Sequence, residues 1–459
     1  MLLIDIGSTY TKLAVLDESS KRLIATAYSP TTIEDVSVGF NHAFDKIKNQ
    51  SVPDDLLYQK YACSSAAGGL RMIAVGLVPE LTVEAAKRAA LGAGAKVIGA
   101  YSFLLMNRQV SEIEAIKPDI ILLAGGTDGG DRKTVVHNAE RIASSKSDAP
   151  VVFAGNREAA DRVENIFEQV GKEIHLADNV MPTVSKINVD SVREIIREVF
   201  LKKIIVAKGL DKINQFINAI VFPTPVAVLE ASKTFARVTH GGVVVVDVGG
   251  ATTDVHSVAE GNPHDPQVVL KGLPEPYAKR TVEGDLGVRH NISTIVNTVG
   301  KKEFLANSKL AEDLDLERVD GLIELWSRKT SALPNGDVEE RFDRQLAACA
   351  VEIAMNRHVG YLEEMWTPMG KVLVQYGKDL TATGMIIGVG GPIVYSSKPR
   401  EILEKALYDV RTPLLLKPQN PRIYVDSCFI LFAIGLISKI HPEIAEGIAW
   451  NYLNQMRLI

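Results

Sequence analysis

Two short segments of the chain combine an aspartate with glycine, serine and threonine, a set of residues that can hold phosphate groups. The first segment reads IDIGSTYTK at residues 4–12, and the second reads VDVGGATTD at residues 246–254. Glycine lets the backbone approach an oxygen closely, and backbone N–H groups together with hydroxyls can surround phosphate oxygens. We therefore predict phosphate contacts from Gly7, Ser8, Thr9, Thr11, Lys12, Gly249, Gly250, Thr252 and Thr253.

Each segment contains an aspartate, Asp5 or Asp247, at the end of an apolar run. A carboxylate at the end of a buried strand is costly unless it is paired. Two carboxylates beside a phosphate chain would repel it unless a cation lay between them, and Mg²⁺ prefers carboxylates, water and phosphates. We therefore predict that Asp5 and Asp247 are metal ligands and catalytic residues that orient an attacking water. The alternative is that each aspartate only caps its own turn.

The elements that must position these residues form a repeat of long period. Each segment reads as a strand, a turn and a second strand, and is followed later by an apolar strand that ends in two glycines, at residues 120–126 and 386–391. This order predicts an α/β fold with duplicated lobes. We place the first lobe at residues 1–235, with an inserted α/β segment at about 130–205, and the second at residues 236–459.

The composition excludes several classes of protein. With 51 basic and 56 acidic residues among 459, the formal charge is −5, which argues against a nucleic-acid binder that uses a general basic field. Cys63, Cys349 and Cys428 are too few and too scattered for a disulfide framework. The longest apolar run, at residues 428–438, is shorter than the roughly 20 residues of a membrane span. We expect a cytoplasmic protein that uses neither membrane nor nucleic acid.

The two phosphate segments and residues 383–395, TGMIIGVGGPIVY, resemble the actin, sugar-kinase and heat-shock-chaperone ATPase superfamily. They are similar to its first phosphate motif, its second phosphate motif and its adenosine motif, in that order. The resemblance implies a two-lobe actin-like fold of duplicated ribonuclease H-like lobes, with a cleft between them that binds ATP and Mg²⁺. It adds Gly388, Gly390 and Gly391 to the expected nucleotide ligands.

A narrower resemblance covers most of the chain. Residues 62–71 (ACSSAAGGLR), 122–133 (LLAGGTDGGDRK) and 282–287 (VEGDLG) are similar to the glutamate mutase accessory protein family, also called MutL. The resemblance implies a chaperone-like partner of adenosylcobalamin-dependent glutamate mutase, which would release damaged cobalamin in a slow Mg-ATPase cycle. It also implies that Glu283 and Asp285 lie near the nucleotide and that Arg71 contacts phosphate or the partner.

Other functions on the same fold stay open at this point. A small-molecule kinase would need a catalytic base, for which only Asp128 and Asp131 in a glycine-rich loop are candidates. A nucleotide-binding scaffold without turnover and a hydantoinase-like hydrolase are further alternatives. The cobalamin signature D-x-H-x-x-G is not completed after Asp254, because Ala259 stands where the glycine belongs. We therefore expect no direct cobalamin binding of that type. A homo-oligomer is compatible with the sequence, which does not specify one.

Overall fold

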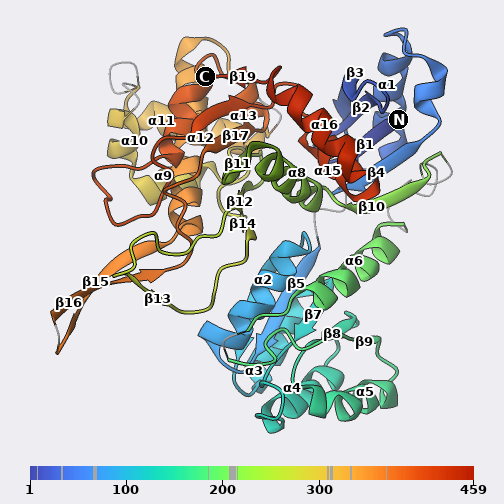
Figure 1. Ribbon diagram of the computed structural model, residues 1–459, viewed down its shortest axis with the longest axis vertical. Helices are drawn as coiled ribbons and strands as arrows, with labels where there is room; N and C mark the ends of the chain where they lie inside the picture. The colour runs from blue at the N-terminus through green and yellow to red at the C-terminus, as the bar shows by residue number, and fades with distance from the viewer. Residues whose placement is uncertain are drawn as a thin grey trace. The chain divides into compact units, whose positions relative to one another are not determined.

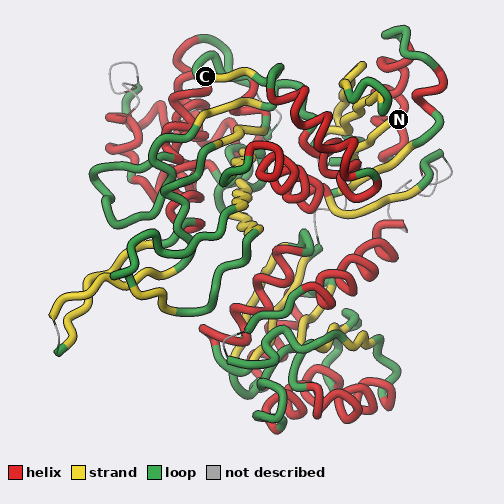
Figure 2. Tube along the Cα trace, in the orientation of Figure 1, coloured by secondary structure: helices red, strands yellow, loops and turns green. Residues whose placement is uncertain are grey.

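The computed structural model describes residues 1–7, 9–32, 35–65, 70–184, 186–205, 213, 216–307, 310, 314–330, 333–368 and 370–459. Helices and strands alternate along much of the chain, as Figure 2 shows by colour. The chain divides into two compact units. Unit 1 comprises Met1–Val228, Gly272–Pro274 and Gly435–Ile440, and unit 2 comprises Leu229–Lys271, Glu275–Ile434 and His441–Ile459.

Unit 1 contains a five-stranded mixed sheet in the order β10-β4-β1-β2-β3 (Figure 1). Strands β1 (Leu2–Ile6), β2 (Tyr10–Asp17) and β3 (Arg22–Pro30) form an antiparallel meander, β4 (Lys60–Ser64) runs parallel to β1, and β10 (Ala219–Pro223) runs parallel to β4. Side chains of β1 alternate between the two faces of the sheet, and all five residues of the strand are buried. Both faces are therefore covered, and Asp5 near the end of the strand is buried with the rest.

Unit 2 contains a six-stranded sheet in the order β14-β12-β11-β17-β18-β19. Strands β11 (Val243–Val248), β12 (Thr253–Val258) and β14 (Ala278–Glu283) form an antiparallel meander. Strands β17 (Met385–Val389) and β18 (Arg422–Val425) follow in parallel to β11, and β19 (Arg457–Leu458) adds an antiparallel edge. The long helix α12 (Asp337–His358) contributes Phe342, Leu346 and Val351 to the apolar core on one face of this sheet.

The two sheets repeat one arrangement, a three-stranded meander followed by two parallel strands on the side of its first strand. The predicted fold class, an α/β protein with duplicated lobes, is therefore confirmed. The segments at residues 4–12 and 246–254 do occupy the same place in the two sheets. The pairing of residues 120–126 with 386–391 is wrong, because β17 corresponds to β4, whereas β7 (Ile120–Leu123) belongs to a different sheet. Both segments are apolar strands that lead into glycines, so the sequence pattern could not separate them.

That different sheet lies in unit 1 and is entirely parallel. Its order is β6-β5-β7-β8-β9, with β5 (Arg71–Gly76), β6 (Lys96–Ser102), β8 (Val151–Phe153) and β9 (Ile174–Leu176) beside β7. Helices alternate with its strands, as parallel pairing requires. They are α2 (Glu84–Gly92), α3 (Asn107–Ile116), α4 (Lys133–Ala143) and α5 (Ala160–Gln169).

A third, small sheet extends from unit 2 as a ribbon. Its order is β13-β16-β15, with β13 (Val269–Lys271), β15 (Tyr361–Thr367) and β16 (Gly370–Tyr376). Strands β15 and β16 form a long hairpin that points away from the rest of this unit in Figure 1. We call this hairpin the arm.

The remaining helices cover the sheets or connect their strands. The apolar run at residues 428–438, which we expect to form a buried core helix, is buried only from residue 430 onward and is helical from residue 431, in α15, whereas Cys428 is exposed. Among the described helices, none combines the length and the hydropathy that crossing a membrane requires. The other helices are α1 (Val36–Lys48), α6 (Asp190–Ile205), α8 (Thr224–Thr239), α9 (Ile292–Val299), α10 (Lys301–Asn307), α11 (Leu316–Arg328), α13 (Gly391–Val394), α14 (Pro399–Leu403), α15 (Leu431–Ile440) and α16 (Pro442–Leu453).

Candidate phosphate-binding site

The hairpin β1–β2 of unit 1 turns tightly around Gly7. The Gly7 N–H donates to the carbonyl of Tyr10 over 3.1 Å, directly before the last strand pair, Ile6 with Thr11. A Cβ on Gly7 would lie 2.6 Å from the Tyr10 oxygen, so only glycine fits there. Thr9 is exposed on this turn, and the predicted contact Ser8 lies outside the described residues.

Asp5 is enclosed by groups of its own unit. Its carboxylate accepts from the Thr224 hydroxyl over 2.5 Å and from the Cys63 thiol over 3.6 Å, and it lies 3.4 Å from the Lys12 ammonium. Lys12 and Cys63 are the cross-strand neighbours of Asp5 on β2 and β4, and Thr224 is the first residue of α8. Burial raises the pKa of the Cys63 thiol, and the charge of Asp5 raises it further, so this thiol stays protonated as a donor. Only 1% of Asp5 is exposed.

The hairpin β11–β12 of unit 2 repeats this backbone. The Gly249 N–H donates to the Thr252 carbonyl over 2.9 Å, again directly before the last strand pair, Val248 with Thr253. Asp247 stands where Asp5 stands in unit 1, but it is only half-buried. Its cross-strand neighbour is Asp254 rather than a lysine.

A loop at residues 284–290 covers one side of this second turn. The Gly249 carbonyl accepts from the Val288 N–H over 3.2 Å, and the Gly250 carbonyl accepts from Arg289 and His290, each over 2.9 Å. In a trans peptide the carbonyl and the following N–H point in opposite directions. The N–H groups of Gly250 and Ala251 therefore point away from the loop. Two consecutive amides that face the same way can bind an anionic oxygen.

The hydroxyls of the predicted threonines already have protein partners. Thr11 bonds to the Thr31 hydroxyl over 3.0 Å, Thr253 donates to the Leu286 carbonyl over 2.8 Å, and Thr252 donates to Asp254 over 3.0 Å. Thr11 and Thr253 are also fully buried. These bonds hold the turns in shape, and they leave the backbone amides as the groups of the second turn that can donate to phosphate.

Charged side chains surround the second turn. Arg280 on β14 binds Asp254 through two nitrogens, at 2.6 and 3.0 Å, and is 6% exposed. Arg357 on α12 binds both Glu283, at 2.6 Å, and Asp285, at 2.8 and 3.0 Å. Burial raises the pKa of Glu283, and the bond to Arg357 opposes this effect. Glu283 thus directly precedes the loop that covers the turn, and Asp285 belongs to that loop.

The glycines after β17 differ in what surrounds them. A Cβ on Gly390 would lie 2.1 Å from the Val248 carbonyl oxygen and 3.0 Å from a carboxylate oxygen of Asp247, and its φ is +92°. Gly390 therefore lies against the base of the second turn. Gly391 has only ordinary contacts with the Tyr395 ring. Gly388 lies in the core, where a Cβ would be 2.5 Å from Leu403, so protein fills its space.

Three further candidate residues make bonds that stabilise local structure. Arg71 donates to the carbonyl of Ile116 at the C-terminus of α3. Asp128 accepts from the Arg157 N–H and the Asn179 amide, and Asp131 accepts from the Thr134 N–H at the start of α4. In the described chain these bonds lie in and around the parallel sheet of unit 1, away from both phosphate hairpins in sequence and sheet. Residues 66–69, in the family motif at residues 62–71, lie outside the described residues.

The sequence alone did not point to Thr224, Arg280, Arg289 or Arg357. Thr224 lies 219 residues from Asp5, and Arg357 lies 74 residues from Glu283, so no local spacing connects them. Arg289 binds Asp343 over 2.6 and 3.1 Å and packs beside Gly250. The alternation of side chains along β14 was the one signal that could have pointed to Arg280. Once β14 pairs with β12, this alternation places Arg280 on the same sheet face as Asp254 and His256.

The carboxylates can be compared as hosts for a divalent cation. Among the described residues, no group of three or more His, Cys, Asp or Glu side chains converges on one position. A Mg²⁺ ion here would therefore need phosphate and water as most of its ligands, which is its usual preference. Asp247, half-buried on the strand that leads into the turn, fits this requirement. Asp5 fits it less well, because three protein groups already surround its carboxylate.

Several solved structures are similar to the chain at low identity. Acetone carboxylase, in a nucleotide-free structure, is 13% identical, with a TM-score of 0.42 over 95% of this chain and 70% of its own. An activator of 2-hydroxyisocaproyl-CoA dehydratase from Clostridium difficile with bound ADPNP is 8% identical, with a TM-score of 0.32 over 100% and 99% of the two chains. A xylulose kinase from Lactobacillus acidophilus is 10% identical, with a TM-score of 0.35 over 100% and 92%. These scores are below 0.5, so the fold assignment depends on the strand order described above.

Sequence comparison is more specific. The family model "MutL protein" matches residues 1–453. Protein MutL from Clostridium tetanomorphum is 46% identical over 459 residues, which covers 98% of each chain. A match of this length includes both phosphate hairpins, the parallel sheet and the arm. The chain belongs to the MutL protein family.

Proposed function

We propose that the protein is an ATP-dependent accessory factor that reactivates adenosylcobalamin-dependent glutamate mutase, using a slow Mg-ATPase cycle. The geometry of the second turn is the main support. The amides of Gly250 and Ala251 point away from the covering loop, and Asp247 lies on the strand that leads into this turn, with one carboxylate oxygen 3.0 Å from where a Cβ on Gly390 would be. Donors next to a half-buried carboxylate suit a phosphate chain that carries a divalent cation.

In this proposal each group has a separate role. The amides of the second turn hold phosphate oxygens, and Asp247 orients the water ligands of Mg²⁺ or the attacking water. Lys12, held over Asp5, is a cation at the corresponding place of the unit 1 hairpin. When bound, Mg²⁺ would neutralise phosphate charge. Because a nucleotide shifts a protein only by binding its states with different affinity, ATP and ADP forms must differ in their affinity for the mutase.

The family supplies the proposed partner, and the resemblance to dehydratase activators fits an accessory role. A small-molecule kinase is the main alternative, since a kinase of the same superfamily is among the similar structures. Its catalytic base is the weak point, because both candidates already accept bonds from backbone N–H groups, Asp128 from Arg157 and Asp131 from Thr134. A scaffold that binds ATP without turnover is the second alternative.

Phosphate release from ATP and Mg²⁺ distinguishes these functions. It should be measured for the protein alone, with inactivated glutamate mutase, and with a panel of small hydroxylated acceptors. Slow turnover that the inactivated mutase changes, together with recovered mutase activity, supports the reactivating factor. Turnover that rises only with a small acceptor identifies a kinase. ATP binding without phosphate release identifies a scaffold.

A further inference from the structure

The arm carries apolar side chains on both of its faces. By the alternation of the strands, Tyr361, Met365, Val372 and Val374 share one face, and Leu362, Trp366 and Leu373 share the other. A ribbon with one face in water normally alternates apolar and polar residues, whereas strands with two apolar faces are covered on both. The first face of the arm is mostly apolar, and the second alternates apolar residues with Glu364, Lys371 and Gln375, so the arm has more apolar residues than a ribbon with one face in water normally shows.

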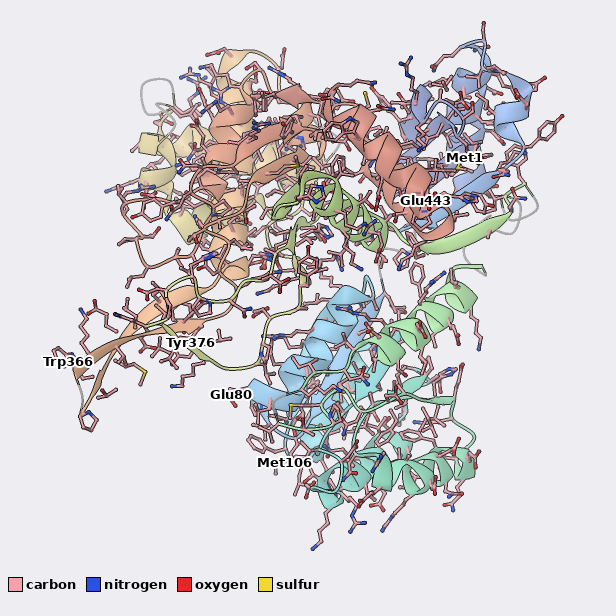
Figure 3. The ribbon with its side chains drawn as sticks, viewed as in Figure 1. Met1, Glu80, Met106, Trp366, Tyr376 and Glu443 are labelled. Carbon is pink, nitrogen blue, oxygen red and sulfur yellow. The ribbon has the colours of Figure 1, made fainter. Side chains whose placement is uncertain are left out.

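The surface of the arm is nevertheless open in the single chain. Trp366 is 81% exposed, Tyr361 is 45% exposed and Met365 is 37% exposed. Figure 3 shows Trp366 at the far end of the arm and Tyr376 nearer to its base. Exposed aromatic side chains grouped in this way mark interaction surfaces, where they contribute much of the binding energy.

The outer edge of the arm also presents backbone groups. Strand β15 is the last strand of its sheet, and the Leu362 N–H donates to the Leu414 carbonyl on the side away from β16. Because backbone groups alternate along a strand, those of Glu364 and Trp366 face the same outward side. In the described part of the chain, only the segment at Leu414 and Leu415 pairs with this edge, at Tyr361 and Leu362, and no further strand of the sheet lies beside Glu364 and Trp366. Such an edge is a template for another strand.

The charges of this sheet indicate which kind of strand can pair with the exposed edge of β15. Glu364 pairs with Lys371 over 2.5 Å, and Glu363 shares its face with Lys271 of β13. Two acidic and two basic side chains leave no net charge, so two copies of the edge can meet without repulsion. An edge selective for an acidic or a basic partner would carry an excess of one sign. We propose that β15 pairs in antiparallel fashion with β15 of a second copy of this chain.

The outward-facing residues define the register. Glu364 and Trp366 of one copy exchange backbone hydrogen bonds with Trp366 and Glu364 of the other, and Met365 lies on the two-fold axis opposite its own counterpart. This is a non-hydrogen-bonded pair, in which the Cα atoms are about 4.5 Å apart. The two Trp366 rings then lie on the joined sheet, beside Glu364 and Lys371.

Cysteine cross-linking tests this register in the full chain. In a Cys428→Ser background, which removes the exposed native cysteine, Met365→Cys should form a disulfide-linked dimer under mild oxidation. The matched control is Glu363→Cys, on the same face of the same strand. Its two copies would be about 14 Å apart in this register and should not cross-link. Equal cross-linking of both variants, or none for Met365→Cys, would overturn the proposed register.

Sedimentation velocity over a range of concentrations tests the edge itself. Glu364→Pro removes an outward N–H while leaving the bonds to β16, and Glu364→Thr removes the same charge but keeps the N–H. We expect the dimer dissociation constant of the proline variant to be at least tenfold above that of the threonine variant. Circular dichroism and ATP binding would check that both variants are folded.

The measurement needs no turnover, so it is independent of the proposed ATPase activity. A wild-type chain that is monomeric at every concentration overturns the proposal, as does a dimer unaffected by Glu364→Pro. A monomeric chain whose arm variants lose binding to glutamate mutase would assign the arm to that partner instead of a second copy. A monomer whose arm binds lipid vesicles would likewise reject the second copy.

Discussion

The two phosphate hairpins have the same backbone and opposite electrostatics. Gly7 and Gly249 close identical turns, and the strand registers match residue for residue. Opposite Asp5 lies Lys12, whereas opposite Asp247 lies Asp254, whose cation Arg280 is one strand further away. The backbone is thus shared between the two units while the charge is not.

This difference indicates a division of labour. In unit 1 the acid is enclosed by three donors, the Thr224 hydroxyl, the Cys63 thiol and the partly exposed Lys12 ammonium. In unit 2 the acid is half-buried next to a second carboxylate, an arrangement that attracts a cation. We therefore expect Asp247 to contribute more to metal binding than Asp5, and Asp5 to contribute more to folding stability.

The parallel strands beside the two hairpins, β4 in unit 1 and β17 in unit 2, also differ at their ends. Ser64 at the end of β4 stands where Gly390 stands after β17, and it donates to the Ile6 carbonyl over 3.2 Å. A side chain fits in unit 1 but not in unit 2, where a Cβ on Gly390 would overlap Val248. The backbone of unit 2 thus passes much closer to its turn.

The largest expected effect is that of Gly390→Ala. A φ of +92° is strained for alanine, and the overlap with the Val248 oxygen adds to it, so we expect a loss of about 3–5 kcal/mol in the free energy of unfolding. Ser64→Ala is the matched change in unit 1 and should cost about 1 kcal/mol. Urea unfolding measures both. Similar values for the two variants would contradict the difference in backbone spacing.

Next in size is the effect of breaking the buried pair of unit 2. Arg280→Met leaves Asp254 without its main partner beside Asp247, and we expect a cost of about 3–5 kcal/mol in unfolding free energy. The double variant Arg280→Met with Asp254→Asn should recover about half of this cost. In unit 1, Lys12 is partly exposed, so the cycle of Lys12→Met and Asp5→Asn should give a coupling of only about 1 kcal/mol. Equal coupling energies for the Arg280–Asp254 pair and the Lys12–Asp5 pair would contradict the electrostatic difference between the two hairpins.

The aspartates themselves sharpen the comparison. If the protein is an ATPase, Asp5→Asn and Asp247→Asn should each lower phosphate release by about 100-fold. Asp5→Asn should also lower the unfolding free energy, by about 1–3 kcal/mol, because it disturbs bonds to three buried or partly buried groups. Raising the Mg²⁺ concentration should partly rescue a metal ligand, so rescue of Asp5→Asn rather than Asp247→Asn would reverse the assignment.

The smallest effect concerns pH. His256 of β12 stands where unit 1 has Ala14, and burial, with the charge of Arg280 second, lowers its pKa from 6.5 to about 3. The unfolded chain then binds a proton that the folded chain does not, so stability falls as the pH drops below about 6.5, by up to roughly 1.4 kcal/mol per pH unit. His358, also buried with a lowered pKa, adds to the slope. His256→Ala introduces the residue that unit 1 has at this place, Ala14. The slope of unfolding free energy against pH, measured by urea unfolding at pH 5 to 7, should fall by the equivalent of about one proton. An unchanged slope would mean that His256 is already protonated in the folded protein.

Much of this architecture was predictable from local pattern. The hairpins at residues 4–12 and 246–254 follow from apolar runs on both sides of glycine-rich turns, and the duplicated α/β class follows from their repetition. The wrong pairing of residues 120–126 with 386–391 has a simple cause. A buried parallel strand followed by glycines has the same sequence pattern in any sheet, and only long-range pairing decides which sheet it joins.

The amino-acid sequence by itself determined which residues could meet a phosphate, because glycine, aspartate and hydroxyl groups act through short-range geometry. Only the tertiary structure decided which of those groups are already bonded to the protein. The threonine hydroxyls are held by Thr31, Asp254 and Leu286, and Asp5 is held by a threonine 219 residues away. Apart from Asp254, which is two residues from Thr252, these partners lie 20 or more residues away in the chain, and their proximity results from sheet pairing and helix packing rather than from local spacing. The same holds for the arm, whose apolar faces are visible in the sequence but whose exposure appears only in the fold.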